Sequence, residues 1–199
     1  MPEGRKSNVL HKSDGGLIVP AGDTHRCHYP SGWEGTYSHT TVATILELGG
    51  LIALILRPEQ EPAEGGKLAL PGGYVEQGDT LAATAVAETV QETGYTIQRG
   101  SLRMFAIMSG PNTLPGRQNE KNLNIVHIFM AEADQQVQEP DHEVDKLLWR
   151  PPSRIGTREE IAFGHFDIVR MYLRHQEQPF ESLPIVPSEM TPDQLFLPQ

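Results

Sequence analysis

The sequence is poor in the features that secretion, membrane insertion and disulfide bonding require. Its 199 residues include one cysteine, Cys27, so the chain cannot form an internal disulfide bond. The first sixteen residues contain no apolar stretch of the kind found at the centre of a secretory signal. The longest nearly apolar run, Leu48 to Leu56, has nine residues, whereas a membrane-spanning helix needs about 20. These absences predict a cytoplasmic protein without a transmembrane segment.

Basic residues are also scarce. The chain has 16 Lys and Arg against 26 Asp and Glu, which gives a formal net charge of -10 at pH 7. An acidic protein repels the phosphates of duplex nucleic acid and of anionic lipid surfaces unless its basic residues cluster. We therefore expect neither duplex nucleic acid nor a membrane as the partner.

Length and composition favour one folded domain. Glycine and proline number 19 and 16, a share well below the roughly 25–30% that marks low-complexity sequence. A chain of 199 residues can bury a core without disulfides or structural metals, but it has no room for a second full-sized domain. We expect the domain at residues 39–175, an N-terminal extension with short strands at 1–38, and an extended Pro-rich tail at 176–199.

Runs of β-branched and apolar residues predict the strands. The clearest case is a hairpin in which residues 40–48 and 51–57 are joined by Gly49-Gly50, because glycines adopt the positive φ angles of a two-residue turn. Further strands are expected in three later apolar runs, at 102–108, 124–131 and 147–149.

Two helices are expected between and after these strands. The first begins near Thr80, runs through Ala-rich sequence and ends at Gly94, which suits the left-handed position after a helix. The second begins at Thr157, where Thr-Arg-Glu-Glu has the pattern of a capping box, and runs to about His175. The tail, with five prolines, is not expected to be helical. Strands and helices in this order indicate a layered α/β fold.

Oxygen-bearing side chains gather on one face of the first helix. At about 100° per residue, Glu88, Gln91 and Glu92 fall on one side. Val86 and Val90 fall on the opposite side, which we expect to pack against the protein. Two carboxylates one turn apart, beside a glycine-rich turn, favour a hard cation such as Mg²⁺ or Mn²⁺. The alternative is that they form the solvent-exposed side of an amphipathic helix.

The stretch from Pro71 to Tyr95 resembles the Nudix box, G-x5-E-x7-R-E-U-x-E-E-x-G-U, in which U is a bulky apolar residue. Four of its seven fixed positions are identical in this chain, two carry near-isosteric residues and one is lost. In order along the box, these positions hold Gly73, Asp79 for Glu, Ala87 for Arg, Glu88, Gln91 for Glu, Glu92 and Gly94.

The resemblance implies a fold and a reaction. The fold is an α/β one, a Nudix-type α/β/α sandwich with a mixed β-sheet, here with an N-terminal β extension and a Pro-rich C-terminal tail. The reaction is the metal-dependent hydrolysis of a nucleoside diphosphate linked to another moiety, with ADP-ribose-like and dinucleotide substrates favoured. The implied cofactor is Mg²⁺ or Mn²⁺, and the implied partner is a small-molecule nucleotide substrate.

The same resemblance implies the residues of the site. Carried over to this chain, the metal ligands are the carbonyl of Gly72 and the side chains of Glu88, Gln91 and Glu92, with Gln91 offering a neutral amide oxygen. Glu88 and Glu92 are also expected to be catalytic. Nudix enzymes often draw a further base from a loop after the box, and in the acidic segment there we choose Glu143. That segment is equally well explained as a solvated run of charge.

Substrate contacts are expected from Arg57, Gly73 and Arg117. A guanidinium donates two parallel hydrogen bonds to phosphate oxygens, and a glycine allows the backbone to approach a ligand closely. Apolar residues of the tail and the N-terminal strands are candidates for a homodimer contact.

A second class of function stays open. Ala87 removes the guanidinium that holds the catalytic Glu in the family, and Gln91 removes one negative charge from the metal site. On this alternative the chain is a catalytically impaired Nudix-fold module that binds a nucleotide or regulates a partner. Divalent-metal binding discriminates between the two, because the hydrolase needs the cation.

Overall fold

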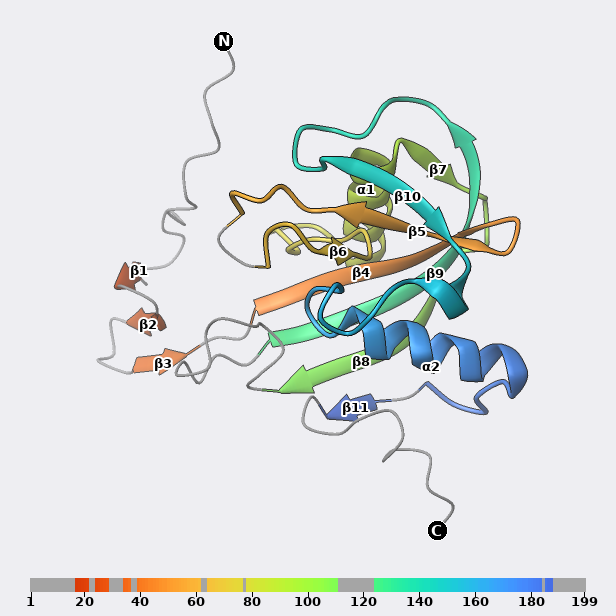
Figure 1. The fold of residues 1–199 in the computed structure, drawn as a ribbon. Helices are drawn as coiled ribbons and strands as arrows, with labels where there is room; N and C mark the ends of the chain where they lie inside the picture. Colours follow the sequence, from red (N-terminus) through yellow and green to blue (C-terminus); the bar gives the residue numbers. More distant parts are fainter. Residues whose placement is uncertain are drawn as a thin grey trace.

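Two helices cover opposite faces of a mixed β-sheet (Figure 1). This computed structural model describes residues 17–21, 24–28, 34–36, 39–61, 64–76, 78–110, 124–183 and 185–187. The helices are α1 (Leu81–Thr93) and α2 (His165–Glu177). The strands of the main sheet are β4 (His39–Leu48), β5 (Leu51–Leu56), β6 (Leu68–Ala69), β7 (Tyr95–Ile97), β8 (Arg103–Gly110), β9 (Asn124–Gln136), β10 (Lys146–Arg150) and β11 (Ile185–Pro187).

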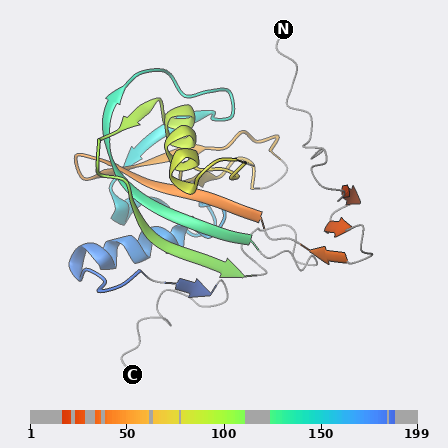
Figure 2. The same ribbon diagram turned by 180° about the vertical axis from the view of Figure 1, so that it is seen from behind.

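The strands of this sheet follow the order β10-β5-β4-β9-β8-β11, with β6 beside β5 and β7 beside β9. The pairs β4–β9 and β8–β11 are parallel, and the other described pairs of the sheet are antiparallel. Figure 2, the view from behind, shows α1 on the face opposite α2. The predicted α/β/α sandwich with a mixed sheet is therefore confirmed.

The hairpin predicted around Gly49-Gly50 is present. Strands β4 and β5 are antiparallel, with Leu48 opposite Leu51 and Glu47 opposite Ile52. Both turn glycines have positive φ, 58° at Gly49 and 80° at Gly50, as a two-residue turn between twisted strands requires.

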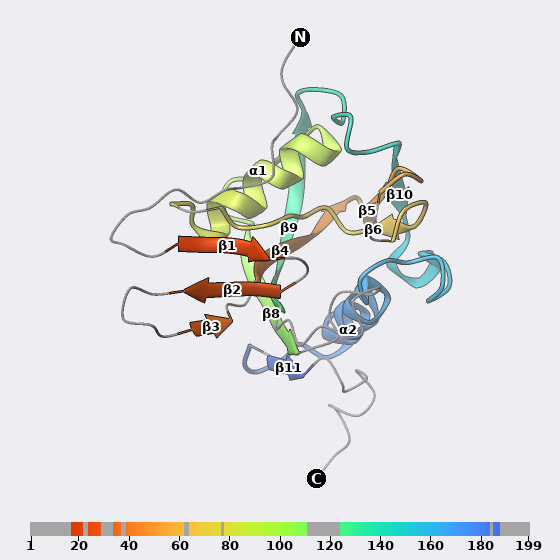
Figure 3. The same cartoon turned by 90° about the vertical axis from the view of Figure 1, so that its left-hand side faces the viewer.

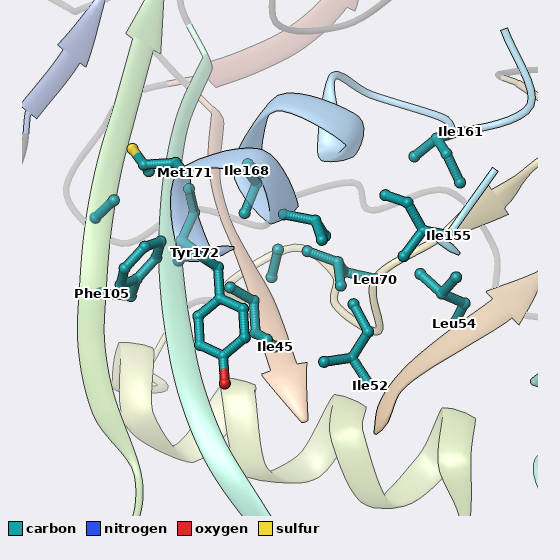
Figure 4. Close-up of a cluster of buried hydrophobic side chains, with 14 of the residues drawn as sticks. Ile45, Ile52, Leu54, Leu70, Phe105, Ile155, Ile161, Ile168, Met171 and Tyr172 are labelled. Carbon is teal, nitrogen blue, oxygen red and sulfur yellow. The ribbon is translucent and has the colours of Figure 1, made fainter. Parts of the chain in front are cut away.

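The sheet separates two apolar layers because successive side chains of a strand point to opposite faces. On β4, Ala43 and Ile45 pack in the larger core with Ile168 of α2 (Figure 4). Val42, which precedes Ala43 and points to the other face, packs with Ala85 of α1. The two helices are thus held by alternate residues of one central strand.

Helix α2 begins eight residues later than its capping box predicts. The predicted local bond does form, since the Thr157 N–H donates to Oε2 of Glu160 at 2.7 Å. Yet the chain then pairs with β6: the Leu68 N–H donates to the Glu160 carbonyl at 2.9 Å, and the Ala162 N–H donates to the Leu68 carbonyl at 2.8 Å. This pairing with a strand far away in sequence replaces the expected first turn of helix.

Two residues of left-handed backbone follow and complete the change of direction. Phe163 has a φ of 57° and Gly164 a φ of 74°, which no α-helix accommodates. The helix can begin only at His165.

Neither α1 nor α2, nor any other helix in the described part of the chain, is long and apolar enough to cross a membrane.

Strand β9 is longer than predicted. The sequence indicates a strand at 124–131, whereas β9 continues to Gln136 because its second half pairs with β7, with Ala133 opposite Ile97. Ala131 and Ala133 are buried while Glu132 between them is exposed. The extension therefore has the alternation of a half-buried strand rather than the continuous apolar run that the prediction relied on.

Short strands occur in the N-terminal region, as predicted. β1 (Leu17–Ala21), β2 (Thr24–His28) and β3 (Glu34–Thr36) form a separate antiparallel sheet (Figure 3). The tail adds β11, which pairs in parallel with β8 through Ile185 opposite Ile107. The boundaries of the three predicted segments and the homodimer contact stay predictions.

We expect Gly94→Ala to destabilise the protein much more than Gly100→Ala does. Both glycines have positive φ, 76° and 81°, so each substitution costs about 1–2 kcal/mol of backbone strain. A Cβ at Gly94 would also lie 2.0 Å from the Gln138 carbonyl oxygen, whereas nothing lies within 4 Å at Gly100. Urea unfolding of the two variants measures the difference, which we expect to exceed about 2 kcal/mol. Equal losses would show that α1 ends independently of the segment at Gln138.

Candidate active site

Helix α1 is bounded by local signals at both ends. The Thr80 hydroxyl accepts the Ala83 N–H at 3.1 Å, which satisfies one of the donors that lack a partner at a helix start. At the other end the Gly94 N–H donates to the Val90 carbonyl at 2.9 Å with left-handed backbone at Gly94. The predicted limits of this helix are confirmed.

The buried side of α1 is the polar one, contrary to the prediction from its valines. Val86 is 39% exposed, whereas Thr89 and Glu92 are 0% and 5% exposed. The expectation that Val86 and Val90 pack against the protein is therefore wrong for Val86, and Val90 is only partly buried. The physical reason is that the glycine turn before the helix lies over the side that carries the carboxylates.

That turn, Pro71-Gly72-Gly73, is bound to β4 by its backbone. The Thr44 N–H donates to the Pro71 carbonyl at 2.8 Å, and the Val42 N–H donates to the Gly73 carbonyl at 2.9 Å. Gly72 faces the other way, because its N–H donates to Oε2 of Glu92 at 2.7 Å. A Cβ on Gly72 would lie 2.1 Å from the Val42 carbonyl oxygen, so only glycine fits between strand and helix.

Glu88 lies against the next residue of the turn. A Cβ on Gly73 would come within 2.5 Å of Oε1 of Glu88. The carboxylate therefore occupies the space that any other residue at 73 would need. Ala87 is exposed and brings no guanidinium, and the close fit to Gly73 limits where the Glu88 carboxylate can go. The substrate contact expected of Gly73 stays a prediction.

The surroundings of Glu92 disfavour its charged form. Burial is the main reason that the pKa of Glu92 is raised from 4.5 to about 8. The hydrogen bond from the Gly72 N–H opposes this rise, and the charges of Glu88, Asp141 and Glu143 contribute to it. Carboxylates of both the helix and the acidic segment after β9 thus act on Glu92.

Within that acidic segment, Asp141 bonds to Gln91 of α1 through both its side chain and its backbone. Its Oδ2 accepts Nε2 of Gln91 at 2.6 Å, and its backbone N–H donates to the Gln91 carbonyl at 3.0 Å. Glu143, the residue chosen from the sequence, is exposed, and its N–H donates to Oδ1 of Asp141 at 2.9 Å. Nothing in the spacing of the segment distinguishes Asp141 from its acidic neighbours, so sequence reasoning missed its contact with Gln91.

Arg57 contacts the loop after β5 and the segment before α2. Its guanidinium lies 4.7 Å from the centre of the Phe163 ring and donates to Oε2 of Glu61 at 3.4 Å. Its backbone N–H donates to the Lys67 carbonyl at 3.0 Å. The predicted phosphate contact of Arg57 stays untested by this geometry, and Arg117 lies outside the described residues.

A buried histidine supports the turn from the α2 side. Nδ1 of His165 accepts the N–H of Leu70, the residue before the turn, at 2.9 Å. Burial, with a smaller contribution from the positive charge of Arg57, lowers the pKa of His165 to about 3. The ring is therefore neutral and holds the chain that leads into the turn. No local sequence signal identifies this contact, because it joins residues 95 apart.

The side chains that could hold a cation are few. Within the described ranges, no group of three or more His, Cys, Asp or Glu side chains is arranged to bind a metal ion. The metal ligands expected from the sequence are not a group of this kind, because only two of them are carboxylates, those of Glu88 and Glu92. The other two are neutral oxygen donors, the Gln91 amide and the Gly72 carbonyl. The structure brings Glu88 and Glu92 to the turn at Gly72 and Gly73, while the described side-chain contact of Gln91 is with Asp141.

A mixed sheet between two helices, with helix glutamates against a glycine turn, is the arrangement that the box resemblance implies. The family model described as NUDIX domain matches residues 38–172, more than half of the chain. The chain therefore belongs to the NUDIX family.

Solved structures resemble this fold at low sequence identity. A NUDIX hydrolase from Nitrosomonas europaea is 23% identical, with a TM-score of 0.60, over 85% of this chain and 92% of that one. The NUDIX domain of Shewanella oneidensis NrtR, complexed with ADP ribose, is 16% identical, with a TM-score of 0.57, over 74% and 92%. These identities support a shared fold.

A third likeness is to part of a longer protein. A bifunctional NMN adenylyltransferase/ADP ribose pyrophosphatase from Francisella tularensis, complexed with AMP and a Mn ion, is 18% identical with a TM-score of 0.55. The match covers 70% of this chain and 42% of that one, so this chain spans less than half of the Francisella protein.

We expect acid to destabilise the protein partly through His165. The unfolded chain protonates His165 near pH 6.5 and the folded protein only near pH 3, so the free energy of unfolding falls as the pH drops from 6.5 to 3. His165→Asn keeps an acceptor for the Leu70 N–H but does not titrate, and should flatten this part of the profile. His165→Leu removes the acceptor and should cost about 1–3 kcal/mol at pH 7. Urea unfolding at several pH values measures both, and an unchanged acid profile in His165→Asn would contradict the assignment.

In metal-free buffer, we expect Glu92 to destabilise the protein as the pH rises, whereas His165 destabilises it as the pH falls. The unfolded chain ionises Glu92 near pH 4.5 and the folded protein near pH 8, so stability falls as the pH rises between these values. Glu92→Gln keeps an oxygen for the Gly72 N–H, and should be more stable than the unchanged protein at pH 8 by an amount on the order of a few kcal/mol. Glu139→Gln removes an exposed carboxylate and serves as the control. Parallel profiles for the unchanged protein and Glu92→Gln would exclude a buried, protonated Glu92.

Proposed function

We propose that this chain is a divalent-metal-dependent hydrolase that cleaves the diphosphate of a nucleoside diphosphate linked to another moiety, with ADP-ribose-like or dinucleotide substrates favoured. The observation that carries the proposal is the close contact of Glu88 and Glu92 with the glycine turn: Glu92 accepts the Gly72 N–H, and the Glu88 carboxylate fills the space beside Gly73. This geometry is retained although Ala87 and Gln91 depart from the box.

The donor set suits a hard divalent cation. The residues that would hold Mg²⁺ or Mn²⁺ are Glu88, Gln91 and Glu92 with the carbonyl of Gly72, all of them oxygen donors. The buried carboxylate of Glu92 supports this fit: burial is the main cause of its raised pKa and the charges of three neighbouring carboxylates add to it, and a bound divalent cation would offset both. Bound there, the cation would neutralise diphosphate charge and lower the pKa of a water nucleophile.

The direction of the Gly72 carbonyl also supports the fit. Pro71 and Gly73 turn their carbonyls toward β4, and Gly72 turns its N–H toward Glu92. We infer that the Gly72 carbonyl, which lies between two carbonyls that face β4, is on the side of the helix carboxylates, as alternation along an extended segment would place it. Glu143 in this proposal accepts the proton of the attacking water, and Arg57 and Arg117 contact phosphate oxygens.

The substrate ranking is supported by ligands of similar folds. The Shewanella domain is complexed with ADP ribose, and the Francisella protein is named an ADP ribose pyrophosphatase and is complexed with AMP and a Mn ion. A nucleoside diphosphate linked to a sugar contains the phosphate groups that a cation at this turn would bind.

A second function is favoured by one observation. Ala87 is exposed, and the family's orienting guanidinium is absent from that position. A site that holds Glu88 less rigidly would bind a nucleotide and turn it over slowly or not at all, as in a nucleotide-binding or regulatory module.

We expect cleavage of a substrate panel to depend on Glu92. Purified protein with Mg²⁺ or Mn²⁺ and a mixed panel of ADP-ribose, dinucleotides and other nucleoside diphosphate compounds is followed by ³¹P NMR. Glu92→Gln should lower the rate at least 100-fold by removing a charged ligand, whereas Glu139→Gln, which removes an exposed carboxylate, should leave it within about twofold. Broadened substrate signals without cleavage would instead establish the binding module, and neither cleavage nor broadening would reject both functions.

A further inference from the structure

Gln91 occupies a box position that usually carries a carboxylate, and its amide has a fixed direction. Nε2 of Gln91 donates to Oδ2 of Asp141 at 2.6 Å. An amide side chain has its two donors on nitrogen and its acceptor on oxygen. With the nitrogen directed to Asp141, the oxygen points away from that carboxylate. The reverse orientation would place two acceptors in contact and is unfavourable.

Asp141 is itself held by contacts at both ends of the residue. Its backbone N–H donates to the Gln91 carbonyl at 3.0 Å, and its Oδ1 accepts the Glu143 N–H at 2.9 Å. The same segment is bound to the last turn of α1, where the Val137 N–H donates to the Gly94 carbonyl at 2.8 Å. These bonds keep the Asp141 carboxylate at one place beside the helix.

Each carboxylate oxygen of Asp141 therefore accepts a hydrogen bond from a different donor. Oδ2 faces the Gln91 amide and Oδ1 faces the backbone of Glu143. Asp141 thus acts on Gln91 through a hydrogen bond.

We propose that Asp141 is a positioning residue that turns the amide oxygen of Gln91 toward the cation site, so that Gln91 and Asp141 together provide the oxygen ligand and the negative charge that one glutamate would provide. The proposal rests on the proposed function, because it concerns the cation that the hydrolase would need. Its support is the direction of the hydrogen bond between the two side chains.

The geometry makes Asp141→Asn a specific perturbation. An asparagine has one acceptor oxygen, and the Glu143 N–H requires it at the place of Oδ1. The NH₂ group then faces Gln91, whose amide must rotate so that its oxygen accepts this new donor. The nitrogen of Gln91 would now point to the cation site. A cation does not bind an amide NH₂ group, so a ligand is lost together with one charge.

The test measures the binding of Mn²⁺ alone, by the electron paramagnetic resonance signal of the unbound ion. We expect Asp141→Asn to bind Mn²⁺ about 10–100-fold more weakly, as substitution of residues that orient a ligand usually does. Glu139→Gln removes the same charge from the same segment and should change the affinity by less than about threefold. Equal effects of the two variants would overturn the proposal.

A double variant restores the ligand by reversing the hydrogen bond. In Gln91→Glu/Asp141→Asn, the carboxylate at 91 accepts the asparagine NH₂ with one oxygen and keeps the other for the cation, and the net charge equals that of the unchanged protein. We expect Mn²⁺ affinity to return to within about threefold of the original or to exceed it. An affinity as low as that of Asp141→Asn alone would show that Asp141 does not act through residue 91.

Two controls separate this proposal from folding and from the proposed function. Thermal unfolding of each metal-free variant shows whether it is folded. Mn²⁺ binding that depends on Glu92 but not on Asp141 would reject the positioning role and leave the hydrolase standing. Absence of Mn²⁺ binding by the unchanged protein would overturn both.

Discussion

The site depends on how closely the glycine turn lies between β4 and α1. A Cβ on Gly72 would collide with the Val42 carbonyl oxygen, and the Gly72 N–H is the hydrogen-bond donor to Glu92. The helix can approach the sheet only with its carboxylates toward this turn. That approach decides which side of α1 is buried and leaves Val86 exposed although it is apolar. The larger apolar core is accordingly on the opposite face of the sheet, under α2.

Elements specified by neighbouring residues could be predicted from the sequence, and those specified by distant pairing could not. Helix α1 has its limits at Thr80 and Gly94 because a side-chain cap and a left-handed glycine act locally. The start of α2 was missed for the opposite reason. Thr157 and Glu160 form their local bond, yet pairing with Leu68 takes the backbone groups that a helix would need.

In the candidate site, too, residues with a local sequence pattern could be predicted and residues that come from distant segments could not. The residues of the box could be picked out by their spacing, and the structure places Glu88 and Glu92 against the turn. The groups that contact them from elsewhere carry no spacing signal. Asp141 lies 50 residues from Gln91 in sequence and looks like any other acid of its segment. His165 reaches the turn across 95 residues as a neutral, buried ring.

The pairing of β11 with β8 also affects how the chain folds during synthesis. β8 is complete at Gly110, but the strand that covers its outer edge begins only at Ile185. During synthesis at roughly 5–20 residues per second, this edge stays open for several seconds while the intervening chain emerges. Unpaired strand edges associate with other chains, so the nascent protein is exposed to aggregation through this edge until β11 docks.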